Sequence, residues 1–203
     1  MMAGYLSHFF GIGIPAVLIF ACFSSYRRRA LTAQGLVSCP TREGMLHLFV
    51  LCLFGLAAMV LWPGYHFEAS QGLWGDLVIH NGRKNWNEGM NLIPLRMVAN
   101  YLRAFRLGMF SYSITQFIGN IATFLPLGFF PALLFRNFGG KKTFLFGLAY
   151  SLGAECCQFF LGRHCDVDDV ILNVAGVMLG YLLYRLISKF FPKFSEKCLC
   201  QRS

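Results

Sequence analysis

Five long apolar runs constrain the fold of this 203-residue chain more than any other feature. A helix needs roughly 20 residues to cross the hydrocarbon core of a bilayer, and each run approaches or exceeds that length. The runs cover residues 3–23, 44–62, 112–135, 143–161 and 170–191. We therefore predict an all-α fold, a polytopic membrane helical bundle of about five spans.

The composition agrees with a membrane protein and leaves little room for a separate soluble domain. Hydrophobic residues make up 56% of the chain and charged residues 13%, whereas soluble domains carry about a quarter charged residues. We predict an N-terminal anchor span with a basic inner loop at 1–41, a membrane domain at 42–190, and a short basic cytoplasmic tail at 191–203.

The basic residues predict the orientation of the bundle. With the N-terminus outside, twelve Lys and Arg fall in the inner segments and six in the outer ones. This bias matches the positive-inside rule and places the C-terminus in the cytoplasm. The net charge of +9 is then explained by topology and by attraction to anionic membrane lipids, the expected partners. It gives no support to nucleic-acid binding.

The long outer connection contains an amphipathic segment. It opens with "NLIPL", in which Asn91 is a candidate helix cap and Pro94 suits a first helical turn. Apolar residues then recur at helical spacing, with basic and amide residues on the other side. The two sets are Leu95, Val98, Leu102, Phe105 and Met109, and Arg96, Asn100 and Arg103. We predict a helix that lies flat in the outer membrane interface.

Small residues and one proline mark expected contacts between the spans. Pro126 lacks a backbone donor and is expected to kink the third span, with Gly128 in the same turn. Gly176 and Gly180 follow the small-xxx-small pattern that lets membrane helices approach closely.

Polar residues of three spans fall at one predicted depth, beneath the outer loop "GRHCDVDD". Polar groups inside a membrane are costly, so their positions carry information about function. We predict an outward-facing polar pocket in which span three contributes one residue, span four two, and the loop and span five the rest. The members are Asn120, Glu155, Gln158, Arg163, Asp166, Asp168, Asp169 and Asn173.

Structural and functional interpretations of these residues both remain open. Structurally, Asp166 can cap the last span, while Glu155 and the amide side chains satisfy one another. Functionally, a buried Glu155 can act as an acid, a base or a proton carrier. Asp166 and Asp168, with His164 nearby, are weak candidates for a divalent cation, and no other cofactor is expected.

Two other features of the sequence do not identify a functional site. No nucleophile–base pair is evident, so the catalytic residues are unknown. The sequence therefore favours a protein that is not an enzyme. Cys198 and Cys200 form a CxC in the tail, which is too short a cluster to bind a metal by itself.

The chain resembles the VanZ-like family of bacterial membrane proteins. The similarity rests on "NLIPL", on "GNIATFLPLGFFPALL" from Gly119, and on "SLGAECCQFFLGRHCDVDDVILNVAGVMLGY" from Ser151. It covers residues 42–186, and Leu95 stands where the family often has an aromatic residue. The characteristic family positions include Pro126 and Gly128. The other characteristic positions coincide with the polar residues identified above.

The resemblance implies a multi-pass protein of the bacterial cytoplasmic membrane that lowers susceptibility to teicoplanin and lipoglycopeptide antibiotics. We expect it to bind a lipid, the drug's lipid tail or a lipid-linked cell-wall precursor at the polar pocket. Two alternatives remain. One is a metal-assisted enzyme acting on a polyprenyl-phosphate or phospholipid headgroup. The other is a small transporter with Glu155 as its proton carrier.

Overall fold

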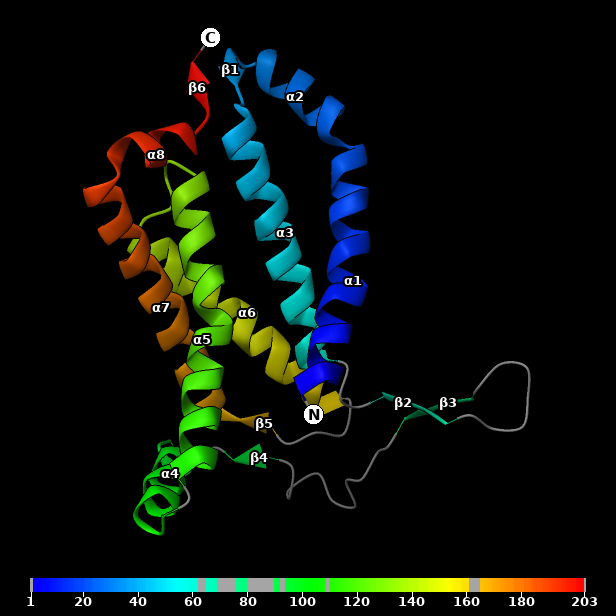
Figure 1. Cartoon of the computed structure of the whole chain (residues 1–203), viewed down its shortest axis with the longest axis vertical. Helices are drawn as coiled ribbons and strands as arrows, with labels where there is room; N and C mark the ends of the chain where they lie inside the picture. Colours follow the sequence, from blue (N-terminus) through cyan, green and yellow to red (C-terminus); the bar gives the residue numbers. More distant parts are fainter. Residues whose placement is uncertain are drawn as a thin grey trace.

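A computed structural model describes residues 2–61, 65–68, 76–79, 90–91, 94–108, 110–160 and 165–202. Five long helices form the bundle in this part of the chain and run alternately in opposite directions (Figure 1). They are α1 (Met2–Cys22), α3 (Pro40–Leu61), α5 (Phe110–Leu134), α6 (Gly140–Phe160) and α7 (Val167–Phe190). The two termini lie at opposite ends of the bundle (Figure 1).

Short elements cover both ends of the bundle. At the end near the C-terminus lie α2 (Ser24–Thr32), α8 (Pro192–Lys197), and the antiparallel pair of β1 (Leu36–Val37) and β6 (Gln201–Arg202). At the other end lie α4 (Arg96–Arg106) and the parallel pair of β4 (Met90–Asn91) and β5 (Cys165–Asp166). A hairpin of β2 (Tyr65–Glu68) and β3 (Asp76–Ile79) projects from this second end (Figure 1). The helical prediction is therefore confirmed, with three short strand pairs that it did not anticipate.

The long helices have the character of membrane spans. In the described residues, three segments are long and apolar enough to cross a membrane: Pro40–Met59, Phe117–Leu134 and Val167–Phe190. The bent pair of α1 and α2 makes a fourth, whereas the 21-residue α6 does not reach the same apolar level. A helical membrane protein is thus confirmed, while the count of five spans and the orientation stay predictions.

The closest packing in the bundle joins α5 to α7. A Cβ added to Gly128 of α5 would overlap the carbonyl oxygen of Val177 in α7. A Cβ on Gly176 or Gly180 of α7 would overlap backbone atoms of α5 in the same way. The absence of these side chains lets the two backbones touch, which is how small residues stabilise membrane helix pairs.

Two local predictions require correction or qualification. Asn91 lies in β4 opposite Asp166 rather than capping a helix, and α4 begins at Arg96, beyond Pro94. Asn91 is engaged in this strand pair, and Pro94 and Leu95 form a turn before α4. In α5 the helix continues through Pro126, and also through Pro131, to Leu134.

Candidate functional site

The N-terminus of α7 is organised by its own aspartates. Asp166 is the N-cap residue, and its Oδ1 accepts a hydrogen bond of 2.9 Å from the backbone N–H of Asp168. Asp168 and Asp169 lie in the first turn, where the helix dipole favours negative charge. The capping predicted for Asp166 is therefore present.

Glu155 links α6 to this capped terminus. Its Oε2 accepts a hydrogen bond of 3.1 Å from the backbone N–H of Asp166. Glu155 is 4% exposed and Gln158, one turn further along α6, is 8% exposed. The end of α6 thus contributes two buried polar side chains to the start of α7.

Asp168 joins α7 to the beginning of α4. It is fully buried, and its Oδ1 accepts a hydrogen bond from the backbone N–H of Leu95, 73 residues earlier. Leu95 is the N-cap residue of α4 and has a φ of 65°, in the left-handed region that a leucine seldom adopts. Strain of this kind is retained only where the surroundings enforce it, and here the carboxylate of Asp168 and the β4–β5 pair hold the segment. Sequence reasoning missed this contact, although it did single out Leu95 as a departure from the family.

The amide side chains make different contacts from those predicted. Asn120 of α5 donates a hydrogen bond of 3.0 Å to Asp169, and Asn173 of α7 donates one of 3.0 Å to Ser151 of α6. The prediction that the amides and Glu155 satisfy one another is therefore wrong for these two contacts. Ser151 was not among the predicted site residues, yet its hydroxyl oxygen is the acceptor.

We call this assembly the polar cluster. It brings together seven of the eight residues predicted from the sequence and adds Ser151 and the N–H of Leu95. The predicted members are Asn120, Glu155, Gln158, Asp166, Asp168, Asp169 and Asn173. Arg163 and His164 lie outside the described residues.

The polar cluster has a definite chemical character. It concentrates carboxylate oxygens at the N-termini of α4 and α7, where backbone N–H groups stabilise negative charge. Groups of this kind can bind hydroxyl, amide or amino groups of a ligand. Over the described residues, no group of three or more His, Cys, Asp or Glu is arranged to hold a metal ion. The cation suggested for Asp166 and Asp168 therefore remains a hypothesis.

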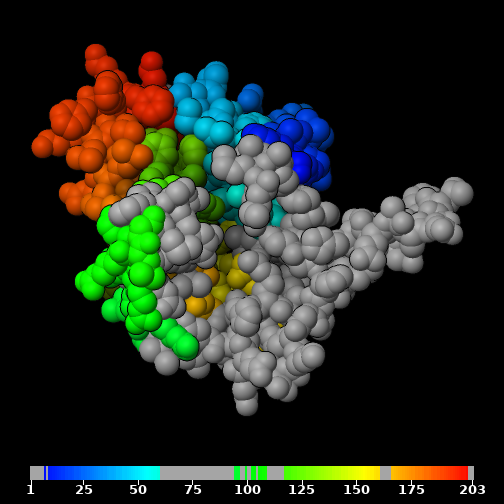
Figure 2. Space-filling view, turned by 60° about the horizontal axis from the view of Figure 1, so that its bottom comes forward, coloured from blue at the N-terminus to red at the C-terminus, as the bar shows by residue number. Residues whose placement is uncertain are grey.

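Helix α4 presents both charge and apolar surface beside the cluster. Arg96, Arg103 and Arg106 are exposed, and so are Leu102 and Phe105, at 60% and 42%. Figure 2, which turns this end of the bundle forward, shows α4 at the surface of the molecule. Exposed arginines and apolar side chains on one helix are typical of an interfacial position.

The tail cysteines lie at the other end of the bundle. Cys198 is fully buried, and burial together with the neighbouring Cys39 thiol raises the pKa of the Cys198 thiol. The thiol of Cys39 donates a hydrogen bond of 2.7 Å to the carbonyl oxygen of Lys197. This hydrogen bond joins the tail to the segment between α2 and α3.

Comparison with known proteins identifies the class. The sequence matches the VanZ/LLP1 family over residues 49–188, a region that contains the polar cluster, so the chain belongs to this family of multi-pass membrane proteins. One relative is Protein VanZ of Enterococcus faecium, which is 32% identical over 108 residues. The alignment covers 48% of this chain and 67% of that protein. No solved structure matches the chain.

Proposed function

We propose that this protein lowers the susceptibility of a bacterium to teicoplanin and related lipoglycopeptides, acting at the outer face of the cytoplasmic membrane. The polar cluster binds the drug's lipid-bearing part or a lipid-linked cell-wall precursor. Membership of the VanZ/LLP1 family and the likeness to Protein VanZ support this proposal.

One observation carries the proposal. The buried carboxylates Glu155, Asp166 and Asp168 lie together at the end of the bundle that we assign to the outside. Buried charge is costly to maintain in a membrane protein, so its presence is a default indication of function. In this proposal the exposed arginines of α4, whose start is joined to the cluster through Leu95, bind the anionic headgroup of a lipid-linked ligand.

The test measures teicoplanin susceptibility in cells that carry Glu155→Gln or Asp168→Asn, at matched amounts of protein in the membrane. Each substitution removes a charge with little change in shape. We expect protection to fall to the level of cells without the protein. Glu196→Gln, in the exposed part of α8 at the opposite end of the bundle, is the matched control and keeps full protection. Wild-type protection by both cluster variants would show that the cluster is not the working part.

A further inference from the structure

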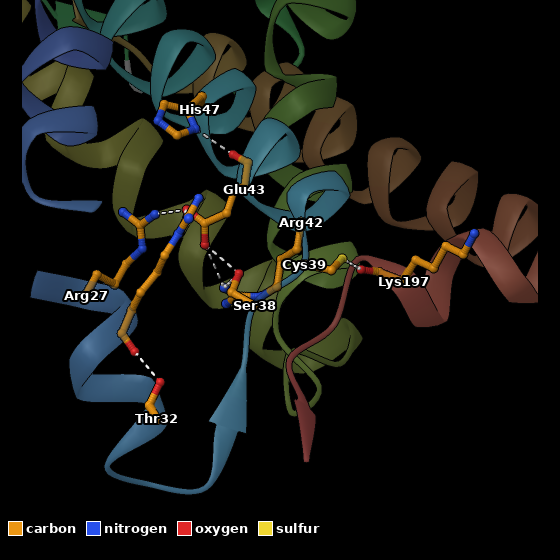
Figure 3. A network of polar contacts seen from close by, with 9 residues as sticks. Arg27, Thr32, Ser38, Cys39, Arg42, Glu43, His47 and Lys197 are labelled. Carbon is orange, nitrogen blue, oxygen red and sulfur yellow. Dashed lines mark hydrogen bonds and ion pairs between the residues drawn. The ribbon is translucent and has the colours of Figure 1, made fainter. Parts of the chain in front are cut away.

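A second charged cluster lies at the opposite end of the bundle, where α2 meets the start of α3 (Figure 3). Its Arg42 and Glu43 are buried, whereas the side chains of Arg27 and Arg28 are 23% and 57% exposed. Three guanidinium groups surround one carboxylate. Nη2 of Arg27 contacts Oε2 of Glu43, Nε of Arg28 lies 4.0 Å from the same oxygen, and Nη1 of Arg42 lies 3.9 Å from Oε1. Ser38 donates a hydrogen bond of 2.5 Å to Oε1 and accepts one of 3.2 Å from Arg42. We call these five residues the arginine cluster.

The arginine cluster lacks hydrogen-bond acceptors. Nε and Nη1 of Arg27 and Nε of Arg42 are buried, and no described residue accepts a hydrogen bond from them. Arg42 is only 5% exposed. The guanidinium of Arg27 lies 4.2 Å from the ring centre of Phe20, so one face of it is already covered. Buried donors of this kind are rare in folded proteins and call for an acceptor.

The charge balance indicates what that acceptor is. Three arginines and one glutamate leave two positive charges in excess. A phosphate group supplies negative charge and several acceptor oxygens, and arginine is the side chain best suited to bind it in a bidentate manner. The missing partner is therefore an oxyanion of the phosphate type.

The surroundings indicate where the phosphate comes from. Helices α1 and α2 meet at an angle of 47° next to Phe23, directly before the arginines. Leu18, Ile19 and Phe23 of this region are 61%, 61% and 62% exposed. Exposed apolar side chains in the turns just before a basic group with buried donors suit an amphiphile, with its acyl chains along α1 and its phosphate at the arginines.

We propose that the arginine cluster is a specific binding site for the phosphate group of an anionic phospholipid in the leaflet at this end of the bundle. The site precedes residues 49–188, the part of the chain that matches the family. The lipid phosphate offsets one of the two excess positive charges and ties α1, α2 and α3 together. The site is thus separate from the polar cluster and does not depend on the function proposed for it.

The test uses the full chain in nanodiscs of phosphatidylcholine with increasing amounts of phosphatidylglycerol. The readouts are the thermal unfolding midpoint and the lipid that remains bound in native mass spectrometry. For the wild type we expect saturable retention of phosphatidylglycerol and a rising midpoint. In Arg27→Gln and Arg42→Gln the apparent affinity for this lipid falls roughly tenfold or more, as expected for lost hydrogen bonds to a charged group.

Two further variants separate a binding site from a merely structural ion pair. Arg136→Gln removes an equal charge from an exposed position at the same end and binds the lipid as the wild type does. Arg27→Lys keeps the charge beside Glu43 but loses the remaining donors of the guanidinium. We expect Arg27→Lys to lose as much lipid affinity as Arg27→Gln. This variant therefore tests the site even if Arg42→Gln does not fold.

A final experiment distinguishes a bound lipid from bound inorganic phosphate as the occupant of the arginine cluster. Inorganic phosphate added to phosphatidylcholine nanodiscs has no acyl chains to place along α1, and we expect no rise in the midpoint. An equal rise with inorganic phosphate alone would overturn the lipid as the occupant. An equal response to phosphatidylglycerol in the wild type and in all the cluster variants would overturn the site.

Discussion

The polar cluster and the arginine cluster lie at opposite ends of one bundle, and both bury charge, but they stabilise it in different ways. In the polar cluster the described contacts to Glu155, Asp166 and Asp168 come from backbone N–H groups, at the starts of two helices. In the arginine cluster the carboxylate of Glu43 is held by charged side chains and a serine hydroxyl. The first arrangement depends on where the backbone lies, and the second depends on a balance of charges.

This difference determines how each end of the bundle responds to amino-acid substitutions. A cluster built on helix termini is disturbed when the helices move apart, whereas a neutral isostere of one carboxylate can keep much of the hydrogen bonding. A cluster built on ion pairs is disturbed when its carboxylate loses its charge, because the guanidinium of Arg42 stays buried without a counter-charge. The predictions below test this contrast, beginning with the largest expected effect.

Gly128→Ala is expected to break the helix packing that supports the polar cluster. The new Cβ would overlap the carbonyl oxygen of Val177, so α5 and α7 must separate. The hydrogen bond from Asn120 to Asp169 crosses this same pair of helices. We expect a loss of more than about 4 kcal/mol, seen as the disappearance of monodisperse protein after extraction into detergent.

Gly119→Ala is the matched control for this change. It lies in the same helix, and a Cβ there meets nothing within 4 Å. We expect its yield and unfolding midpoint to equal those of the wild type. Equal behaviour of Gly128→Ala and Gly119→Ala would contradict the close approach of α5 and α7.

Glu43→Gln is the corresponding change at the other end. It keeps the size of the side chain but leaves Arg27, Arg28 and Arg42 without their common counter-charge. Removing one partner of a buried ion pair typically costs 3–5 kcal/mol. Because Arg28 is exposed and Arg27 partly exposed, we expect a loss at the lower end, about 3 kcal/mol. The measurement is the thermal unfolding midpoint in a neutral detergent. Glu196→Gln, which is exposed, should change stability by less than about 0.5 kcal/mol, and an equally small effect of Glu43→Gln would refute the charge-balance account.

Much of the polar cluster could be predicted from the sequence because helices have a fixed rise per residue. Once the apolar runs are placed as antiparallel spans, Asn120, Glu155 and Asn173 fall at one depth without any knowledge of packing. The cap at Asp166 follows from local chemistry alone. Depth and local capping are therefore the parts of this site that sequence patterns contain.

The missed contacts depend on how separate segments meet. Leu95 and Asp168 are 73 residues apart, and only the folded chain shows that they pair. Arg27 and Glu43 lie on opposite sides of a break between helices, so their charges are visible in the sequence but their contact is not. The start of α4 was misplaced for the same reason, because only the folded chain shows that Asn91 pairs with Asp166 in a strand.

Asp166→Ala is expected to have the smallest effect of the three, and it separates capping from charge within the polar cluster. Alanine removes the acceptor for the N–H of Asp168, and loss of a helix N-cap costs about 1 kcal/mol. Asp166→Asn keeps an oxygen acceptor and is expected to retain most of that stability. The measurement is the unfolding midpoint of both variants in the same detergent. If Asp166→Asn loses as much as Asp166→Ala, the negative charge rather than the cap stabilises this end, and the contrast with the arginine cluster fails.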